Sequence, residues 1–140
     1  MLVTQINSFL LATPLKQPIR TAIHNFAQVY HVVVEIETDE GLKGTGFLFA
    51  QSAAQGKLFQ ATLELFKPLV LQEDPLMVEH IWQKIWKAAN FIGNSGVSIF
   101  GLSAIDTALW DIMGKVAGLP LYKLLGAKAK AVPVYASGGL

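Results

Sequence analysis

The order of the periodic segments predicts an α+β fold in which strands come first and helices follow. Residues 27–38 and 42–49 alternate between apolar and polar side chains, which is typical of an antiparallel hairpin with one apolar and one mixed face. From residue 53 onward the apolar residues recur at helical spacing instead. Because strands and helices are segregated along the chain, an alternating βαβ architecture is disfavoured.

The composition is that of one ordinary folded domain. Of the 140 residues, 52% are hydrophobic and 15% are charged, so the chain is too apolar to be disordered, and its apolar runs are too short for a membrane span. Eleven basic residues balance ten acidic ones without a clustered basic face, which argues against nucleic acid as a partner. The mean hydropathy of +0.42 is high and indicates that something else covers part of the surface.

Two absences in the sequence narrow the function further. The sequence has no cysteine, which excludes disulfides, thiolate nucleophiles and cysteine metal ligands. The first residues lack the basic start and the small-residue cleavage site of a signal peptide, so we expect a cytoplasmic location.

The first third of the chain predicts three strands. Residues 3–11 alternate loosely and form the expected first strand, whereas residues 13–26 contain two prolines and no clean period, which predicts a loop. The second strand is expected over 27–38, followed by a turn at 39–41 and a third strand over 42–49.

Two helices are expected to follow the strands in the middle of the chain. Phe59, Leu63 and Phe66 indicate a helix over 53–66, which Pro68 limits. Asp74 and Pro75 read as the N-cap and first position of the next helix. Its apolar stripe consists of Val78, Ile81, Trp82, Ile85 and Trp86.

The longest helix is predicted over residues 99–116. Asn94 or Ser95 is expected to cap its start, Gly118 ends it, and Pro120 starts a short helix after it. One side of this helix carries an apolar stripe made of Ile99, Leu102, Ile105, Leu109, Ile112, Met113 and Val116.

Two acids on this helix are candidates for chemistry or for structure. Asp111 falls nearly opposite the stripe, where it can pair with Lys115 at i,i+4. Asp106 lies at the edge of the stripe, where a carboxylate needs donors, so a backbone amide cluster or a basic side chain is expected beside it. We interpret both acids as structural, because buried polar groups are usually hydrogen-bonded anchors.

Other candidate sites have simpler explanations. His31, Glu35 and Glu37 share one strand face and suggest a metal, but the mixed outer face of a hairpin accounts for them. The glycines of residues 41–46 open a strand rather than a helix, so they do not form a dinucleotide loop. The segment 93–96 precedes a helix and can hold an anion, although plain capping is the simpler interpretation.

The helix signature resembles that of the mandelate racemase/muconate lactonizing enzyme family, within the enolase superfamily. The hairpin at 38–47, the Asp74-Pro75 start and the tail at 132–139 resemble the family as well, and Gly101 departs from it, since an alanine is frequent there. The residues that carry the helix signature are Ser103, Ala104, Ile105, Asp106, Ala108, Leu109, Asp111, Gly114, Lys115, Pro120, Leu124, Leu125 and Gly126.

The resemblance implies a two-part chain. Residues 1–127 would form a capping domain, a three-stranded antiparallel sheet followed by a helical bundle. Residues 128–140 would form a connector and, at 132–136, the first strand of a (β/α) barrel whose remaining strands are absent from this sequence.

The family abstracts the proton α to a carboxylate, with Mg²⁺ stabilising the enediolate and Lys or His as base. The resemblance places the metal ligands and bases on later barrel strands, so we expect no catalytic and no metal-binding residue in this chain, which alone should be inactive. Lys128 and Lys130 spell a Lys-x-Lys base motif, but they precede the strand instead of ending it and are assigned to the connector. An acid-sugar dehydratase or an α-hydroxy-acid racemase is favoured over a cycloisomerase.

The resemblance also assigns substrate selection to two loops of the capping domain, at residues 14–26 and 47–56. Arg20 is suited to a substrate carboxylate or hydroxyl and His24 to a distal polar group, although an ordinary solvated loop charge and an ordinary loop histidine are the alternatives. The candidate substrate-binding residues are Ile19, Arg20, Thr21, Ile23, His24, Phe26 and Phe49.

The expected partners are a small carboxylate substrate, the chain's own C-terminal barrel and further copies of the chain in a homo-oligomer. The alternative is a stand-alone binding or assembly module that has lost its barrel. The apolar composition and the unpaired strand at 132–136 disfavour that alternative, because an unpaired strand invites aggregation.

Overall fold

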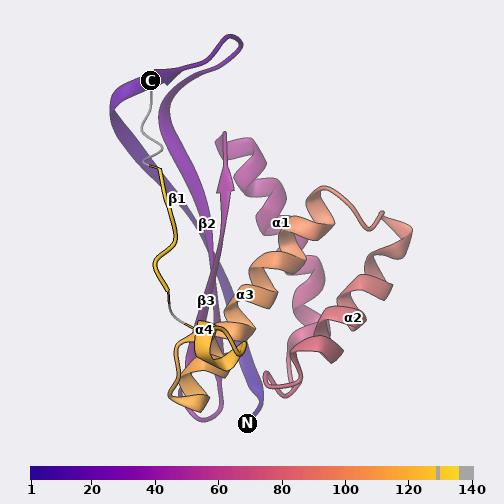
Figure 1. Cartoon of the computed structure of the whole chain (residues 1–140). Helices are drawn as coiled ribbons and strands as arrows, with labels where there is room; N and C mark the ends of the chain where they lie inside the picture. The colour runs from indigo at the N-terminus through magenta and orange to yellow at the C-terminus, as the bar shows by residue number, and fades with distance from the viewer. Residues whose placement is uncertain (129, 136–140) are drawn as a thin grey trace.

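A three-stranded sheet with its three long helices on one face makes up the protein (Figure 1), in a computed structural model that describes residues 1–128 and 130–135. The strands pair antiparallel in the order β1-β2-β3, which confirms the predicted α+β class. The elements are β1 (Val3–Arg20), β2 (Asn25–Thr38), β3 (Lys43–Ala50), α1 (Ala53–Val70), α2 (Val78–Ala88), the 3₁₀ turn η1 (Ala89–Phe91), α3 (Val97–Ala117) and α4 (Leu121–Leu124).

The core lies between the sheet and the helices, as the periodicities predicted. Val32, Val34 and Ile36 of β2 are fully buried beneath the helices, and the stripes of the helices meet them from the other side. Val116 departs from its expected stripe because it lies in the last turn of α3, where it is 46% exposed. The buried helical residues are Phe59, Leu63, Phe66, Ile81, Ile85, Leu102, Ile105, Leu109 and Ile112.

The backbones of β3 and α3 touch where the two elements cross. A Cβ placed on Gly44 would lie 2.0 Å from the carbonyl oxygen of Ala108, and one on Gly46 would lie 2.0 Å from that of Ala104. Real Cβ atoms essentially never approach an oxygen so closely, so any other residue at these two positions would force the helix and the strand apart. These glycines therefore serve helix–strand packing, in line with the rejection of a phosphate loop.

The expected loop at 13–26 is instead the continuation of β1 and the start of β2. β1 is an edge strand, where the missing N–H of a proline leaves no ladder bond unmade, so Pro14 and Pro18 fit within it. The ladder pairs Pro14 with Gln28 and resumes at Ile19 with Phe26, so four residues of β1 lie opposite one residue of β2 in a large bulge. The two prolines therefore mark a bulge within paired strands, and the expected loop is absent from this segment.

The expected end of the first helix and the expected start of the second were wrong, whereas α1 begins at Ala53 as predicted. α1 begins after Ser52, whose hydroxyl accepts from Gln55 N at 3.2 Å, and it continues two residues past Pro68. Asp74 accepts a hydrogen bond from Leu76 N at 3.0 Å, so it stabilises a turn and α2 starts only at Val78.

Of the remaining helix ends, the cap of α3 differs from the prediction, whereas the end of α3 and the start of α4 agree with it. Gly96, with φ of 56°, precedes α3, and neither Asn94 nor Ser95 caps it, because the left-handed glycine turns the chain directly into the helix. Gly118 ends α3 in the left-handed conformation, and Pro120 directly precedes α4, as predicted.

The expected barrel strand at 132–136 does not form a strand over its described residues, 132–135, and residue 136 lies outside the described part. No described strand hydrogen-bonds to this segment, and a strand needs a neighbour. α3 is long and apolar enough to cross a membrane by length and composition, but half of its apolar window is buried inside the protein, as in a core helix.

Candidate functional site

The β1–β2 hairpin extends as an arm beyond the body of the protein (Figure 1). β3 ends at Ala50 opposite Tyr30, so from there to the tip the sheet formed by the described residues has two strands. The tip is a tight turn in which Thr21 N donates to the carbonyl of His24 at 2.8 Å and His24 N donates to the Thr21 hydroxyl at 2.9 Å. The sequence forms this turn because a Thr side chain can replace a backbone acceptor.

Six of the seven predicted substrate-binding residues meet on this tip. Ile19 pairs with Phe26 and Arg20 with Asn25 across the ladder, and the rings of His24 and Phe26 lie 5.4 Å apart. Arg20, Thr21 and His24 are exposed, and the Ile23 side chain is 82% exposed. Among the described residues, the turn and the ladder hold this exposed segment, and its side chains are free to contact a ligand or another domain.

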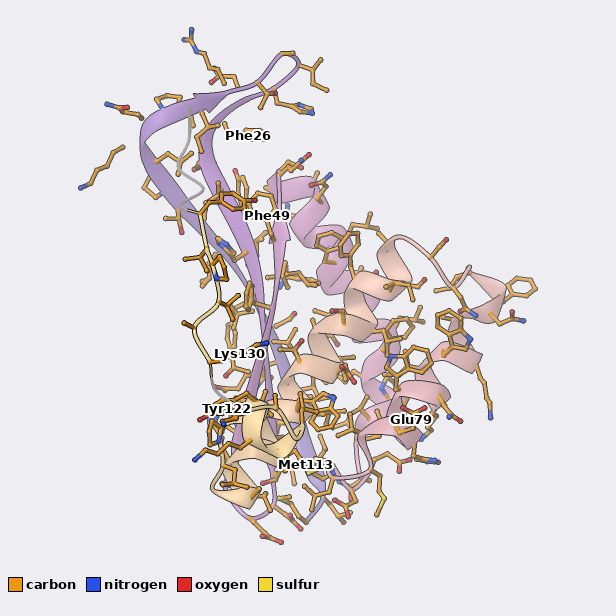
Figure 2. All side chains as sticks on the ribbon, in the orientation of Figure 1. Phe26, Phe49, Glu79, Met113, Tyr122 and Lys130 are labelled. Atoms are coloured by element: carbon orange, nitrogen blue, oxygen red, sulfur yellow. The ribbon has the colours of Figure 1, made fainter. Side chains whose placement is uncertain are left out.

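Phe49, the seventh residue, lies apart from the tip at the end of β3 (Figure 2). Its ring stands edge-on to His31 at 5.8 Å, and it is 51% exposed. The expected loop at 47–56 does not exist, because β3 runs to Ala50 and α1 begins at Ala53.

A shallow hollow surrounds Phe49 where β3, α1 and α3 meet. Gln51 and Gln55 both line it, and the backbone N–H of Gln51 donates to Oε1 of Gln55 at 2.8 Å. Sequence reasoning missed Phe100 and Ser103 here, because α3 reaches this place only through tertiary packing. The hollow is lined by Phe47, Leu48, Phe49, Gln51, Gln55, Phe59, Phe100 and Ser103.

The arm is free of negative charge. The first acidic residue of the sequence is Glu35, so residues 1–34 carry Lys16 and Arg20 and two histidines with no opposing carboxylate. A basic extension of this kind attracts an anion and offers guanidinium donors to a carboxylate.

The described residues contain no group of three His, Asp or Glu side chains able to hold a metal. Glu35 and Glu37 on the outer sheet face are bound by Lys43 Nζ at 3.2 and 2.5 Å, and hydrogen bonding to that ammonium lowers the pKa of Glu37. A site already filled by a lysine does not fit Mg²⁺, which needs open carboxylate oxygens. These acids belong to the mixed face of the sheet.

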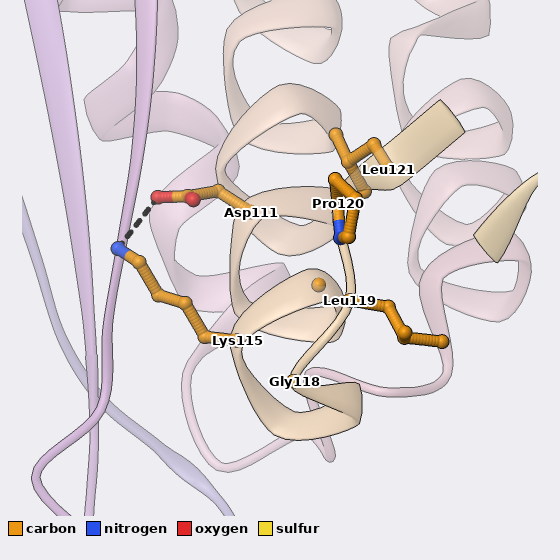
Figure 3. A pocket seen from close by; sticks show the side chains of 7 residues that line it. Asp111, Lys115, Gly118, Leu119, Pro120 and Leu121 are labelled. Carbon is orange, nitrogen blue, oxygen red and sulfur yellow. Dashed lines mark hydrogen bonds and ion pairs between the residues drawn. The ribbon is translucent and has the colours of Figure 1, made fainter. Parts of the chain in front are cut away.

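Asp111 lies beside a hollow at the end of α3, where its carboxylate is already engaged (Figure 3). Its Oδ2 accepts from Lys115 Nζ at 2.8 Å, the predicted i,i+4 pair, and from the backbone N–H of Thr45 at 2.8 Å. Lys115 Nζ also donates to the carbonyl of Lys43 at 2.6 Å. Both side chains therefore tie α3 to the free edge of β3, and the structural interpretation of Asp111 fits this geometry.

Asp106 lacks the donors that the sequence led us to expect. It is half-buried, and within residues 1–128 and 130–135 nothing donates a hydrogen bond to it. Burial raises the pKa of its carboxyl group, and the charge of Glu79 on α2 adds to the effect. Asp106 is therefore not a hydrogen-bonded anchor among the described residues, and it lies on the helical layer, away from the arm.

Comparison with known proteins identifies the family to which this domain belongs. The family model "Mandelate racemase / muconate lactonizing enzyme, N-terminal domain" matches residues 5–126. Arabinonate dehydratase of Saccharolobus solfataricus is 45% identical over 109 residues, which cover 77% of this chain and 29% of that protein. D-galactarolactone cycloisomerase of Agrobacterium fabrum is 34% identical over 139 residues, which cover 99% of this chain and 36% of that protein.

Solved structures agree with the sequence relatives. L-talarate/galactarate dehydratase from Salmonella typhimurium LT2 superposes with a TM-score of 0.83 at 32% identity, over 91% of this chain and 34% of that one. A member of the enolase superfamily from Polaromonas sp. JS666 superposes with a TM-score of 0.88 at 27% identity, over 100% of this chain and 37% of that one. The chain thus spans about a third of the length of the relatives it matches.

Proposed function

This chain belongs to the mandelate racemase/muconate lactonizing enzyme family, and from that premise we propose that it caps the active site of an enzyme acting on an acid sugar. The observation that carries the proposal is the arm, which gathers Arg20, Thr21 and His24 on an exposed, acid-free tip. In our proposal Arg20 contacts a carboxylate or hydroxyl of the substrate, and His24 contacts a distal polar group.

The arm suits a lid because it projects beyond the body while its ladder keeps it ordered up to the bulge. A closing lid excludes water from the reacting atoms, which proton abstraction next to a carboxylate requires. Ile19, Ile23 and Phe26 supply the apolar surface for this exclusion, and Phe49 extends it toward the body of the domain.

The outer face of the sheet supports contact with a second domain of the same protein. The ladder aligns Phe9 with Val33 and Phe47 in one row and Leu11 with His31 and Phe49 in the next. Phe9 and Leu11 are each about half exposed. An apolar patch of this kind marks an interface, and we propose that the family's C-terminal barrel covers it.

We assign the catalytic chemistry to residues outside this chain. Structures of relatives carry Mg, for example L-talarate/galactarate dehydratase with Mg and L-glucarate. The described residues here do not fit a magnesium site, so we propose that the metal ligands and the base belong to the barrel, and that this chain alone is inactive.

The names of the relatives favour a polyhydroxy acid as substrate and dehydration as the reaction. Loss of the α-proton and of the β-hydroxyl as water converts such an acid into an α-keto acid, so the product carries a new carbonyl. Cycloisomerisation is the second candidate, because the cycloisomerase relative matches 99% of this chain. Racemisation is a third outcome, distinguished by exchange of the α-hydrogen with solvent but no loss of water.

The test is to incubate the full-length protein with Mg²⁺ and a panel of aldonates, aldarates and their lactones. We expect an α-keto acid from at least one aldonate or aldarate and none when EDTA is present. Lactone isomerisation without an α-keto acid would favour the second candidate. A folded full-length protein that neither transforms nor binds any sugar acid would overturn the proposal and favour a stand-alone assembly module.

A further inference from the structure

α1 carries an apolar seam on the surface that faces away from the core. Its members follow one another at intervals of four, three, four and three residues, which is the 3.5-residue period of a coiled coil. Leu58 and Leu65 in this seam are 51% and 56% exposed, whereas the outward face of a solvated helix is normally polar. The seam consists of Ala54, Leu58, Ala61, Leu65 and Pro68.

Two opposite charges flank this seam on one side. Lys57 and Glu64 are exposed and lie seven residues apart, so they occupy equivalent positions in successive heptads. In a parallel pair of α1 helices, Lys57 would face Thr62 of the partner subunit and gain no opposite charge. In an antiparallel pair, Lys57 faces Glu64 of the partner subunit, and two-fold symmetry forms that pair twice.

The same antiparallel register matches the sizes of the seam residues. When Lys57 faces Glu64 of the partner subunit, Leu58 lies against Ala61 of the partner subunit, and Leu65 lies against Ala54 of the partner subunit. Each layer then joins one large and one small side chain, which lets two helices approach closely without voids. Charge and volume thus favour the antiparallel orientation independently, and the charge pair selects the register.

We propose that α1 is a self-association surface, on which a second copy of this chain packs its own α1 in antiparallel orientation. The proposal does not depend on the substrate or on the arm. It assigns a definite surface to the homo-oligomer expected from the sequence, and it uses a face of α1 that the core leaves exposed.

A charge-swap cycle in the full-length protein tests the pairing. Lys57→Glu places an acid against Glu64 of the partner subunit in two symmetric places, so we expect the dimer Kd to rise about tenfold in sedimentation velocity. Glu64→Lys should weaken the dimer similarly, although it also removes the contact with Lys67 at 3.6 Å. The double variant should restore the Kd to within about twofold, and Lys87→Glu on α2 is the charge-matched control.

Disulfide trapping gives a geometric test that other interfaces cannot mimic. Residues 1–140 contain no cysteine, so once any cysteine elsewhere in the full-length protein is replaced, an equimolar mixture of the Leu58→Cys and Ala61→Cys variants should give a covalent dimer on mild oxidation. Either substitution alone should not, since equivalent residues are a layer apart in the antiparallel register and too distant for a disulfide. A monomeric protein, a Kd indifferent to the charge swap, or cross-linking by Leu58→Cys alone would overturn the proposal.

Discussion

The carboxylate of Asp111 on α3 accepts a hydrogen bond from the backbone N–H of Thr45 on β3, with 2.8 Å between Oδ2 and the nitrogen. β3 is an edge strand, so this N–H has no strand partner on its outer side. Lys115 satisfies the neighbouring carbonyl of Lys43 in the same way. An acid of the family signature thus satisfies an edge-strand donor that lies 66 residues earlier in the chain.

Removing this contact should weaken the domain. We expect Asp111→Ala to lower the free energy of unfolding by about 1–2 kcal/mol, because it removes a charge-assisted hydrogen bond and an ion pair that are only partly screened by solvent. Urea denaturation measures the change. Turnover per folded molecule of the full-length enzyme should not fall. A loss of turnover at unchanged stability would show that Asp111 has a catalytic part.

The crossing of β3 and α3 makes Gly46 intolerant of any side chain. Gly46→Ala would press a methyl group against the carbonyl oxygen of Ala104, at 2.0 Å in the present geometry, so the helix must move off the strand. We expect a loss of about 3 kcal/mol in unfolding free energy. Thr45→Ala, one residue away with its side chain outward, should cost less than about 1 kcal/mol. Equal effects from the two substitutions would contradict this packing.

Asp106 should make the protein less stable as the pH rises, which is the opposite of the usual effect of an acidic residue. Burial and Glu79 raise its pKa in the folded state, so the folded protein binds the proton more tightly than the unfolded chain does. The ionised carboxyl therefore destabilises the protein increasingly as the pH rises through the folded-state pKa.

Substitution by a neutral isostere tests this directly. Asp106→Asn should raise the melting temperature at pH 7, and its advantage over the wild type should vanish below pH 3.8, the ordinary value of the group, where the wild-type acid is protonated in both states. Thermal melts of both proteins from pH 3 to pH 8 measure the difference. A lower melting temperature of the variant at pH 7 would mean that Asp106 has a donor in the intact protein.

The features predicted well from the sequence are those that local periodicity encodes. The stripe around Ile105 and Leu109 and the alternation around Val34 follow from the spacing of apolar residues, and both form the core. The pair between Asp111 and Lys115 lies within one helix turn and was also predictable.

The misses depend on contacts distant in the sequence. The arm through Pro14 is a strand because β2 pairs with it, and no local signal distinguishes such an edge from a loop. The bond from Thr45 to Asp111 and the absence of a donor for Asp106 are set by how α3 crosses the sheet. For the site, the register of Ile19 with Phe26 gathers the tip residues, whereas the place of Phe49 follows from the length of β3.

Steady-state kinetics of Arg20→Ala in the full-length enzyme tests the central claim most directly. The Arg20 side chain is exposed, and its backbone pairing with Asn25 survives the change, so the fold should persist with an unaltered melting temperature. We predict that kcat/KM for the acid sugar falls about tenfold to a hundredfold, as expected for a lost charge-assisted hydrogen bond, while Lys87→Ala on α2 leaves it unchanged. An Arg20→Ala enzyme with wild-type kcat and KM would contradict the assignment of the arm to substrate recognition.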